Sequence, residues 1–171
     1  SVLSANLTAS GAAGITVTND LQVLGANRTI TTVSGNLNLA AVDATGTAYG
    51  LTLTTTSGTH NVGNVGASAA LASLTSSAGG TTNFTGTTVT TTGAQAYNNA
   101  VTLAANNTFA TTNSAVSFAG TLNSATSTPR NLSINVGTSN ITFTGAVGAT
   151  NALGAMALNS TGTTTFSSTV A

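Results

Sequence analysis

The chain has 171 residues, of which 40% are hydrophobic but only 2% are charged, against about 25% charged residues in an ordinary globular domain. The charges, Asp20, Arg28, Asp43 and Arg130, cancel, which excludes the basic surface that nucleic acid or anionic lipid requires. No apolar stretch reaches the roughly 20 residues of a membrane-spanning helix, so we expect neither a nucleic-acid partner nor membrane insertion. A mean hydropathy of +0.31 and a single proline disfavour a disordered chain.

Short strands around a narrow apolar core are predicted along the chain. Residues 1–20 are irregular, with scattered apolar side chains and a turn over GAAG at 11–14. From residue 21 onward, apolar residues alternate in pairs such as Val101 and Leu103, separated by Thr, Asn, Ala and Gly. Side chains two apart on a strand face the same side, so each pair points into one interior while the residue between them points out.

A long repeat organises these strands into two copies of a unit of about 80 residues. The segments VGASAALASL and GTTNF, which begin at Val65 and Gly80, have the counterparts VGATNALGAM and GTTTF, which begin at Val147 and Gly162. We divide the single predicted domain, residues 1–171, into irregular first coils (1–20), a first unit (21–100) and an incomplete second unit (101–171). The matched apolar positions of the two units are Leu21/Val23 with Val101/Leu103, Ile30 with Phe109, Leu37/Leu39 with Val116/Phe118, Leu51/Leu53 with Leu132/Ile134, and Val62 with Phe143.

Within each unit the strands recur at uneven steps of about 14 to 21 residues, with Gly or Asn at the corners. This spacing is typical of a β-solenoid, whose coils bury their inner faces only by stacking on neighbours, and about eight to ten coils would fit. A β-sandwich is the structural alternative, although it does not account for the long repeat. The Ala-rich segment Ala67–Leu74 could instead form a short helical turn.

The segments VTTTGAQAYNNAVTLAANNTF and GAVGATNALGAMALNSTGTTTF resemble the repeats of large bacterial secreted β-strand-repeat proteins. The repeats of these proteins are similar in type to those of the filamentous-haemagglutinin-like and autotransporter adhesins. The resemblance covers most of the chain after about Leu21. It implies an all-β, right-handed parallel β-helix on the outside of a bacterial cell, serving as a stalk, adhesin or matrix component. No catalytic motif comes with it.

Candidate catalytic groups are scarce. Asp20 and Asp43 are the only acids, and the second unit has none at the matching loops, so we interpret both as turn residues. His60 lies two residues before Val62, on the inward face of a predicted strand or at its edge, with no acid or second histidine nearby. The sequence therefore predicts no enzymatic activity, no metal site and no cofactor. Because almost nothing can titrate, folding should be indifferent to salt and to pH between about 3 and 10.

Threonine is abundant enough to suggest an ice-binding solenoid, in which outward Thr-x-Thr pairs recur on every coil. Thr52 and Thr54 form one such pair, but the long repeat matches them to Ser133 and Asn135. The rank is therefore predicted to be broken. Outward threonine is then explained by the preference of β-branched residues for strands.

Two loops stand out as candidate interaction surfaces, because loops on a rigid scaffold often carry recognition. Residues 41–50 and 121–131 occupy the same predicted corner in the two units. The candidate interaction residues within them are Asp43, Tyr49, Pro129 and Arg130. The alternative function is an adhesin module that binds a carbohydrate or host surface through these loops.

The two ends of the chain are as apolar as its middle, and no charged side chain lies before Asp20 or after Arg130. Monomeric solenoids protect their terminal coils with polar caps, charges or proline. The leading prediction is an extracellular structural protein at the bacterial cell surface that stacks head to tail with copies of itself, or with further repeats of a longer chain. The candidate end-to-end contacts are Val2, Leu3, Leu7, Phe166 and Val170.

Overall fold

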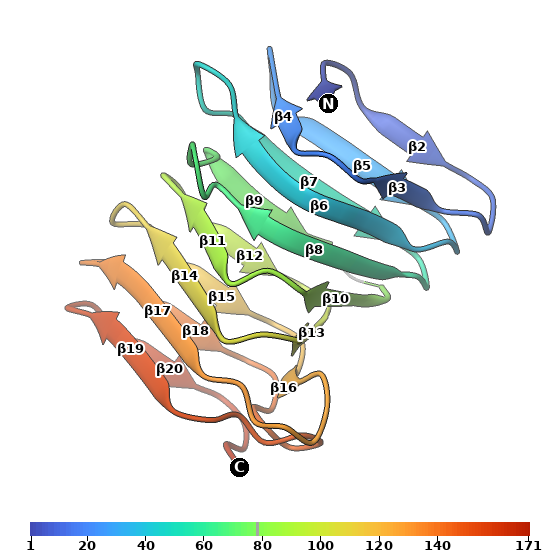
Figure 1. The fold of residues 1–171 in the computed structure, drawn as a ribbon. Coiled ribbons are helices and arrows are strands. Elements are labelled where there is room, and N and C mark those ends of the chain that lie inside the picture. The colour runs from blue at the N-terminus through green and yellow to red at the C-terminus, as the bar shows by residue number, and fades with distance from the viewer. Residues whose placement is uncertain (78) are drawn as a thin grey trace.

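The protein is an all-β solenoid in the computed structural model, which describes residues 1–77 and 79–171 (Figure 1). The pairings between named strands are all parallel. The predicted parallel solenoid is thus confirmed, and the sandwich alternative is wrong. No helix occurs among the described residues, and hence none that could cross a membrane. Within Ala67–Leu74, Leu71 forms a parallel bridge with Thr91 instead of a helical turn.

The strands form one sheet of twelve and one of eight (Figure 1). The twelve-stranded sheet contains β1 (Val2–Leu3), β3 (Ile15–Val17), β4 (Leu21–Val23), β6 (Leu37–Ala44), β8 (Thr59–Val65), β10 (Thr81–Phe84), β11 (Thr88–Thr91), β13 (Ala100–Leu103), β14 (Asn107–Thr111), β16 (Leu122–Ser124), β17 (Leu132–Gly137) and β19 (Met156–Ser160). The eight-stranded sheet contains β2 (Leu7–Ala9), β5 (Arg28–Thr32), β7 (Gly50–Thr55), β9 (Ser73–Ser76), β12 (Gln95–Tyr97), β15 (Val116–Phe118), β18 (Ile141–Phe143) and β20 (Thr164–Phe166).

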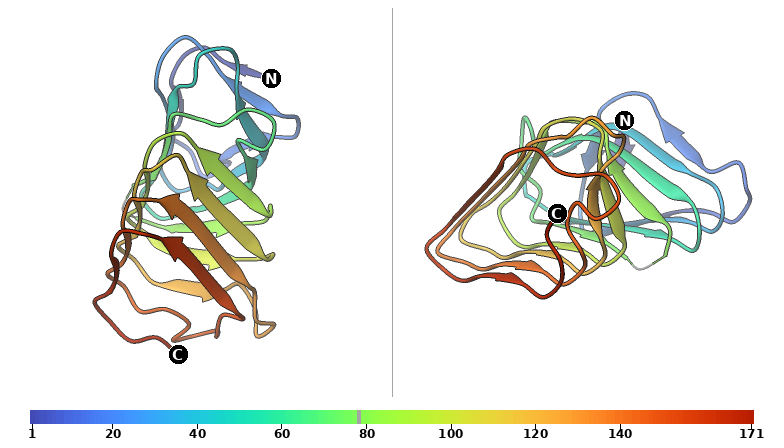
Figure 2. Two further views of the ribbon diagram at one scale, coloured as in Figure 1. Left: turned by 90° about the vertical axis from the view of Figure 1, so that its left-hand side faces the viewer. Right: turned by 90° about the horizontal axis from the view of Figure 1, so that it is seen from below.

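Each coil passes through three columns of strands. The first column contains β3, the start of β6 and of β8, β10, β13 and β16. The second contains β1, β4, the ends of β6 and β8, β11, β14, β17 and β19. The third column is the eight-stranded sheet. The coils stack along one axis, with the two termini at opposite ends of the stack (Figure 2).

The length of a coil varies along the stack. A hydrogen bond from Thr102 to Asn83 in the coil below spans 19 residues, and one from Asn131 to Asn106 spans 25 residues. The described chain therefore completes about seven turns rather than the predicted eight to ten. The shorter predicted steps, such as Leu37 to Leu51, connect the two sheets within one coil instead of linking successive coils.

The long repeat of the sequence is not a whole number of coils. Ile30 lies in β5 of the eight-stranded sheet, but its match Phe109 lies in β14 of the twelve-stranded sheet. Leu51 and its match Leu132 are separated in the same way. Residues that correspond in the repeat therefore occupy different sides of the coil.

The core is a continuous column of inward side chains. The predicted inward pairs are all buried, with at most 4% exposure: Leu37/Leu39, Leu51/Leu53, Val101/Leu103, Val116/Phe118 and Leu132/Ile134. In the third column the rings of Tyr97, Phe118, Phe143 and Phe166 stack on successive coils, with centroids 4.9, 5.3 and 4.7 Å apart. These separations are close to the strand spacing of about 4.8 Å, so the rings follow the register of the coils.

Asparagine side chains join the coils at their corners. Asn36 Oδ1, for example, accepts a 2.9 Å hydrogen bond from the backbone N–H of Thr59 in the next coil. Such bonds link coils without any ion pair and satisfy backbone donors that the corners would leave unpaired. Eight asparagines each accept from a residue 23 to 25 positions later: Asn6, Asn27, Asn36, Asn64, Asn106, Asn113, Asn131 and Asn140.

His60 is a buried polar side chain without a hydrogen bond, and the hydroxyl of Thr32 and Oδ1 of Asn107 also lack a partner among the described residues. Its side chain lies fully buried in β8, on the inward face as predicted, between the inward positions of Leu37 and Thr82. Neither ring nitrogen has a hydrogen-bond partner among the described residues. Burial lowers the pKa of His60 below its usual value of 6.5, and the nearby backbone of Thr54 offsets only part of this, since the apolar core disfavours the charged imidazolium.

This buried histidine should make stability fall on the acid side. The unfolded chain binds a proton at His60 near pH 6.5 while the folded chain does not, so stability is full above that pH and falls below it. We expect a lower melting temperature at pH 5 than at pH 7.5. The pH range over which stability is predicted to be constant therefore ends near pH 6.5 on the acid side. His60→Leu should remove most of this difference, as measured by thermal circular dichroism. An equal drop in the variant would show that another group causes it.

Candidate functional site

The two candidate loops do not share a corner. Residues 45–49 connect β6 to β7, from the twelve-stranded to the eight-stranded sheet (Figure 1). Residues 125–131 connect β16 to β17 within the twelve-stranded sheet. The prediction that 41–50 and 121–131 occupy one corner is therefore wrong, because the repeat on which it depended moves each residue to another side of the coil.

Asp43 is a structural residue in the strand β6 and not an exposed loop residue. It is only 4% exposed, and its Oδ1 accepts hydrogen bonds from the backbone N–H groups of Ser68 and Ala69 at 2.9 and 3.0 Å. Those two residues belong to the corner of the next coil. The carboxylate therefore holds a loop in place, and it is not available to a ligand.

Asn123 plays the same role in the second copy of the repeat. Its Oδ1 accepts from the N–H groups of Thr150 and Asn151 at 3.0 and 3.4 Å. Both bracketed loops follow a Val-Gly pair whose glycine has a positive φ, 63° at Gly66 and 74° at Gly148, a conformation that favours glycine. The sequence repeat thus encodes one local loop structure, which the coil uses at two different corners.

The remaining candidates do not make a continuous patch. Tyr49 is half-buried and packs against the apolar core. Pro129 is exposed, while Arg130 is half-buried, with Nε shielded from solvent and without a partner among the described residues. The backbone of Arg130 is part of the corner, since its N–H donates to Ser124 Oγ and its carbonyl accepts from Gly154.

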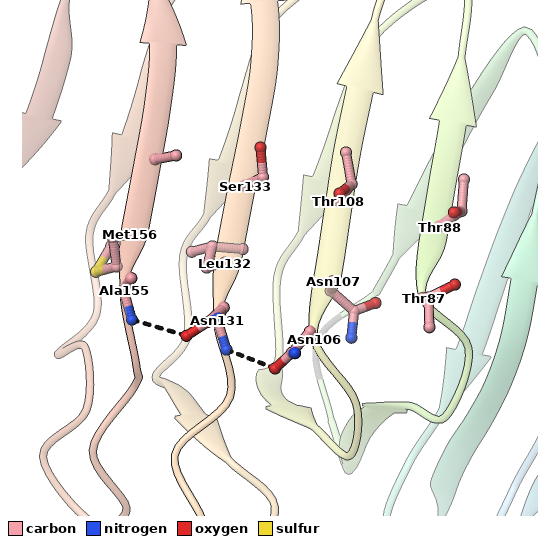
Figure 3. A pocket seen from close by; sticks show the side chains of 11 residues that line it. Thr87, Thr88, Asn106, Asn107, Thr108, Asn131, Leu132, Ser133, Ala155 and Met156 are labelled. Carbon is pink, nitrogen blue, oxygen red and sulfur yellow. Dashed lines mark hydrogen bonds between the residues drawn. The ribbon is translucent and has the colours of Figure 1, made fainter.

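A shallow groove of about 560 Å³ lies on the second column, beside the corner that precedes β14, β17 and β19 (Figure 3). Thr88, Thr108 and Ser133 point outward along it. At its edge the amides of Asn106 and Asn131 accept corner hydrogen bonds of 2.9 Å, from the N–H groups of Asn131 and Ala155 (Figure 3). The residues that line the groove are uncharged, and its edge amides already serve the corners.

The described residues contain no group of three or more His, Cys, Asp or Glu side chains that could hold a metal ion. Asp20 is exposed at a turn, where its carbonyl accepts from the amino group of Ser1. His60 and Asp43 have the structural environments described above.

The ends of the stack expose apolar side chains. Val2 and Leu7 are 61% and 38% exposed at the first coil, and Phe166 and Val170 are 40% and 51% exposed at the last. Leu3 differs from the prediction, since it is only 6% exposed and belongs to the core. The outer edges of β1, β2, β19 and β20 have no neighbouring strand among the described residues. Both ends are thus open in their backbone and in their side chains.

The outer face of the eight-stranded sheet carries ranks of hydroxyl groups. In the true register Thr29, Thr52 and Thr75 lie on successive coils. The predicted reason for a broken rank is wrong, because Ser133 and Asn135 lie on another sheet and are not the neighbours of Thr52 and Thr54. The rank is nevertheless interrupted, at Ala96. The complete rank is Thr29, Thr52, Thr75, Ala96, Ser117, Thr142 and Thr165.

No family model, no curated protein and no solved structure matches the chain. The resemblance of its repeats to secreted adhesins therefore stays a prediction.

The stabilising role of the two hydrogen bonds that Asp43 accepts can be tested directly. Asp43→Ala removes the acceptor of two N–H groups and should reduce the free energy of unfolding by about 1–3 kcal/mol. Asp43→Asn should cost much less, because Asn123 performs this function with an amide. Urea unfolding followed by circular dichroism measures both. Equal losses would show that the negative charge, and not the acceptor oxygen, stabilises the loop.

Proposed function

We propose that this chain is a non-enzymatic structural segment that extends by stacking end to end, as a filament or as the stalk of a protein on the bacterial cell surface. The observation that carries the proposal is the state of the two ends. Each combines unpaired strand edges with exposed apolar side chains. Natural monomeric solenoids cap such coils, because an open edge is a template for pairing with another chain.

The two end faces are complementary in their order of strands. A second copy placed head to tail would continue the second column by pairing β19 with β1, and the third column by pairing β20 with β2. Val170 would lie next to β3 in the first column, where it already bridges Val147. Each column would then run through the junction as it runs through the coils of one copy.

Burial supplies the driving force. The ring of Phe166 ends the aromatic stack at 4.7 Å from Phe143 and is open on its other side. Fully burying an exposed side chain of the size of Phe, Leu or Val gains about 1.5–3 kcal/mol, and the end side chains, which are 38% to 61% exposed, would gain a corresponding part of that. No like charges oppose the contact, since no charged side chain follows Arg130 in the sequence.

The location outside a bacterial cell rests on the resemblance of the repeats to secreted β-strand-repeat proteins. The near absence of charge agrees with a protein whose purpose is to stack, because electrostatic repulsion is what normally keeps soluble proteins apart. Further repeats of a longer chain would satisfy the ends in the same way as a second copy.

The end-to-end contact predicts a specific response to charge. Leu7→Lys and Val170→Lys place a cation on each end face and should stop growth while leaving the strand signal in circular dichroism intact. Thr108→Lys is the matched control, since Thr108 points outward in the middle of the stack (Figure 3). Sedimentation velocity and electron microscopy should show concentration-dependent filaments for the parent and the control only. A parent that stays monomeric at high concentration, with both terminal coils protected from hydrogen exchange, would contradict the proposal.

A further inference from the structure

The hydroxyl ranks on the eight-stranded sheet form a two-dimensional array. The first rank was given above, and its members are on parallel strands that lie about 4.8 Å apart. A second rank lies two residues further along each strand, about 6.6 Å away. It begins with Thr8, Thr31 and Thr54, which are in register on β2, β5 and β7. Over β5 and β7 the outer face of this sheet therefore repeats a threonine hydroxyl in both directions, whereas on β12 the first rank is interrupted by Ala96.

These hydroxyls are free to bond outside the protein. Among the hydrogen bonds of residues 1–77 and 79–171, the hydroxyls of Thr29, Thr52 and Thr75 have no protein partner. The corresponding hydroxyls of Thr142 and Thr165 have none either within the described part of the chain. In the second rank, Thr54 makes one long contact of 3.5 Å with Ser77.

On the first column, by contrast, the outward polar side chains form hydrogen bonds with one another. There the amide of Asn61 donates to Asn38 at 2.8 Å, and the amide of Asn83 donates to Asn61 at 3.0 Å. Thr102 and Thr16 complete this ladder at its two sides. The outward polar groups of that column bond to one another from coil to coil, whereas on the eight-stranded sheet the long contact between Thr54 and Ser77 is the one such bond among the described residues.

The hydroxyl face is also uncharged. The one cation in the named strands of this sheet, Arg28, turns back to its own corner, where Nε and Nη2 donate to the carbonyl of Leu24 at 3.1 and 2.8 Å. The rings of Tyr97, Phe118 and Phe143 point inward and are buried. The described residues of this face therefore present only neutral hydroxyls, methyl groups and small side chains, with no aromatic ring to hold a sugar and no charge to hold an ionic ligand.

We propose that the outer face of the eight-stranded sheet binds ice. Ice is a neutral lattice of hydrogen-bond donors and acceptors, so an uncharged array of unbonded hydroxyls at fixed spacings complements it. The threonine hydroxyls hold ordered water, as polar protein groups do, and the methyl groups between them keep other water from competing. The face is most regular over β5, β7 and β9, and again over β18 and β20, with Ala96 and Ser117 between the two parts.

Ice binding is measured by thermal hysteresis and by uptake into a slowly growing ice hemisphere. The protein carries Leu7→Lys and Val170→Lys throughout, so that the result does not depend on end-to-end stacking. In this background Thr52→Lys with Thr75→Lys should abolish hysteresis and ice uptake. The matched controls are Thr88→Lys and Thr108→Lys, which are also half-buried, outward threonines, but lie on the twelve-stranded sheet. They should retain both activities.

Circular dichroism confirms that each variant is folded before comparison. A parent protein without hysteresis or ice uptake overturns the proposal, and so does an equal loss in the control variants. Co-sedimentation with insoluble cellulose or chitin, lost on Thr52→Lys but without ice uptake, would assign the face to a polysaccharide instead. The milder change of Thr52 and Thr75 to valine keeps the shape and removes only the hydroxyls. It should weaken ice uptake if those groups hold the ordered water.

Discussion

The match between one coil and the next is the constraint on which the whole molecule depends. A coil has only its two neighbours to pair with, so each strand must stay in register over a strand one full coil before it, whatever the length of that coil. Variation in coil length is absorbed at corners, where asparagine amides bond to the next coil. With almost no ion pairs possible in a chain that is 2% charged, these bonds and the inward side chains supply the stability.

The inward face could be predicted because it is a local property. Alternation identifies Val101 and Leu103, or Val116 and Phe118, without any knowledge of their partners. The number of coils could not, because the strongest repeat in the sequence spans several coils and does not end where a coil ends. Copies of the repeat therefore fall on different sides of the coil, and short steps such as Leu37 to Leu51 lie within one coil instead of joining successive coils.

The candidate functional surfaces could likewise be predicted only where they depend on local sequence and not on the register between coils. Exposed ends follow from composition, so Val2, Leu7, Phe166 and Val170 could be predicted, while Leu3 is buried in the core. Asp43 and the threonine ranks depend on which residue lies above which. No pattern within one strand shows that Asp43 meets Ser68, or that Thr75 follows Thr52. One signal was available: the Val-Gly pairs at Gly66 and Gly148 match in the long repeat, as do the loops that Asp43 and Asn123 hold.

The two proposals meet in the geometry of the stack. Each coil that carries Thr or Ser at the outward position adds one hydroxyl to the rank, so the number of contacts that the face can make at once grows with the number of such coils in register. Because simultaneous contacts multiply affinity without any new kind of interaction, a face that is weak on one coil becomes strong on a long solenoid. Continuation of β20 by β2 across a junction would extend the same face, since both strands belong to the third column. If both proposals hold, the length of the stack determines how strongly the hydroxyl face binds.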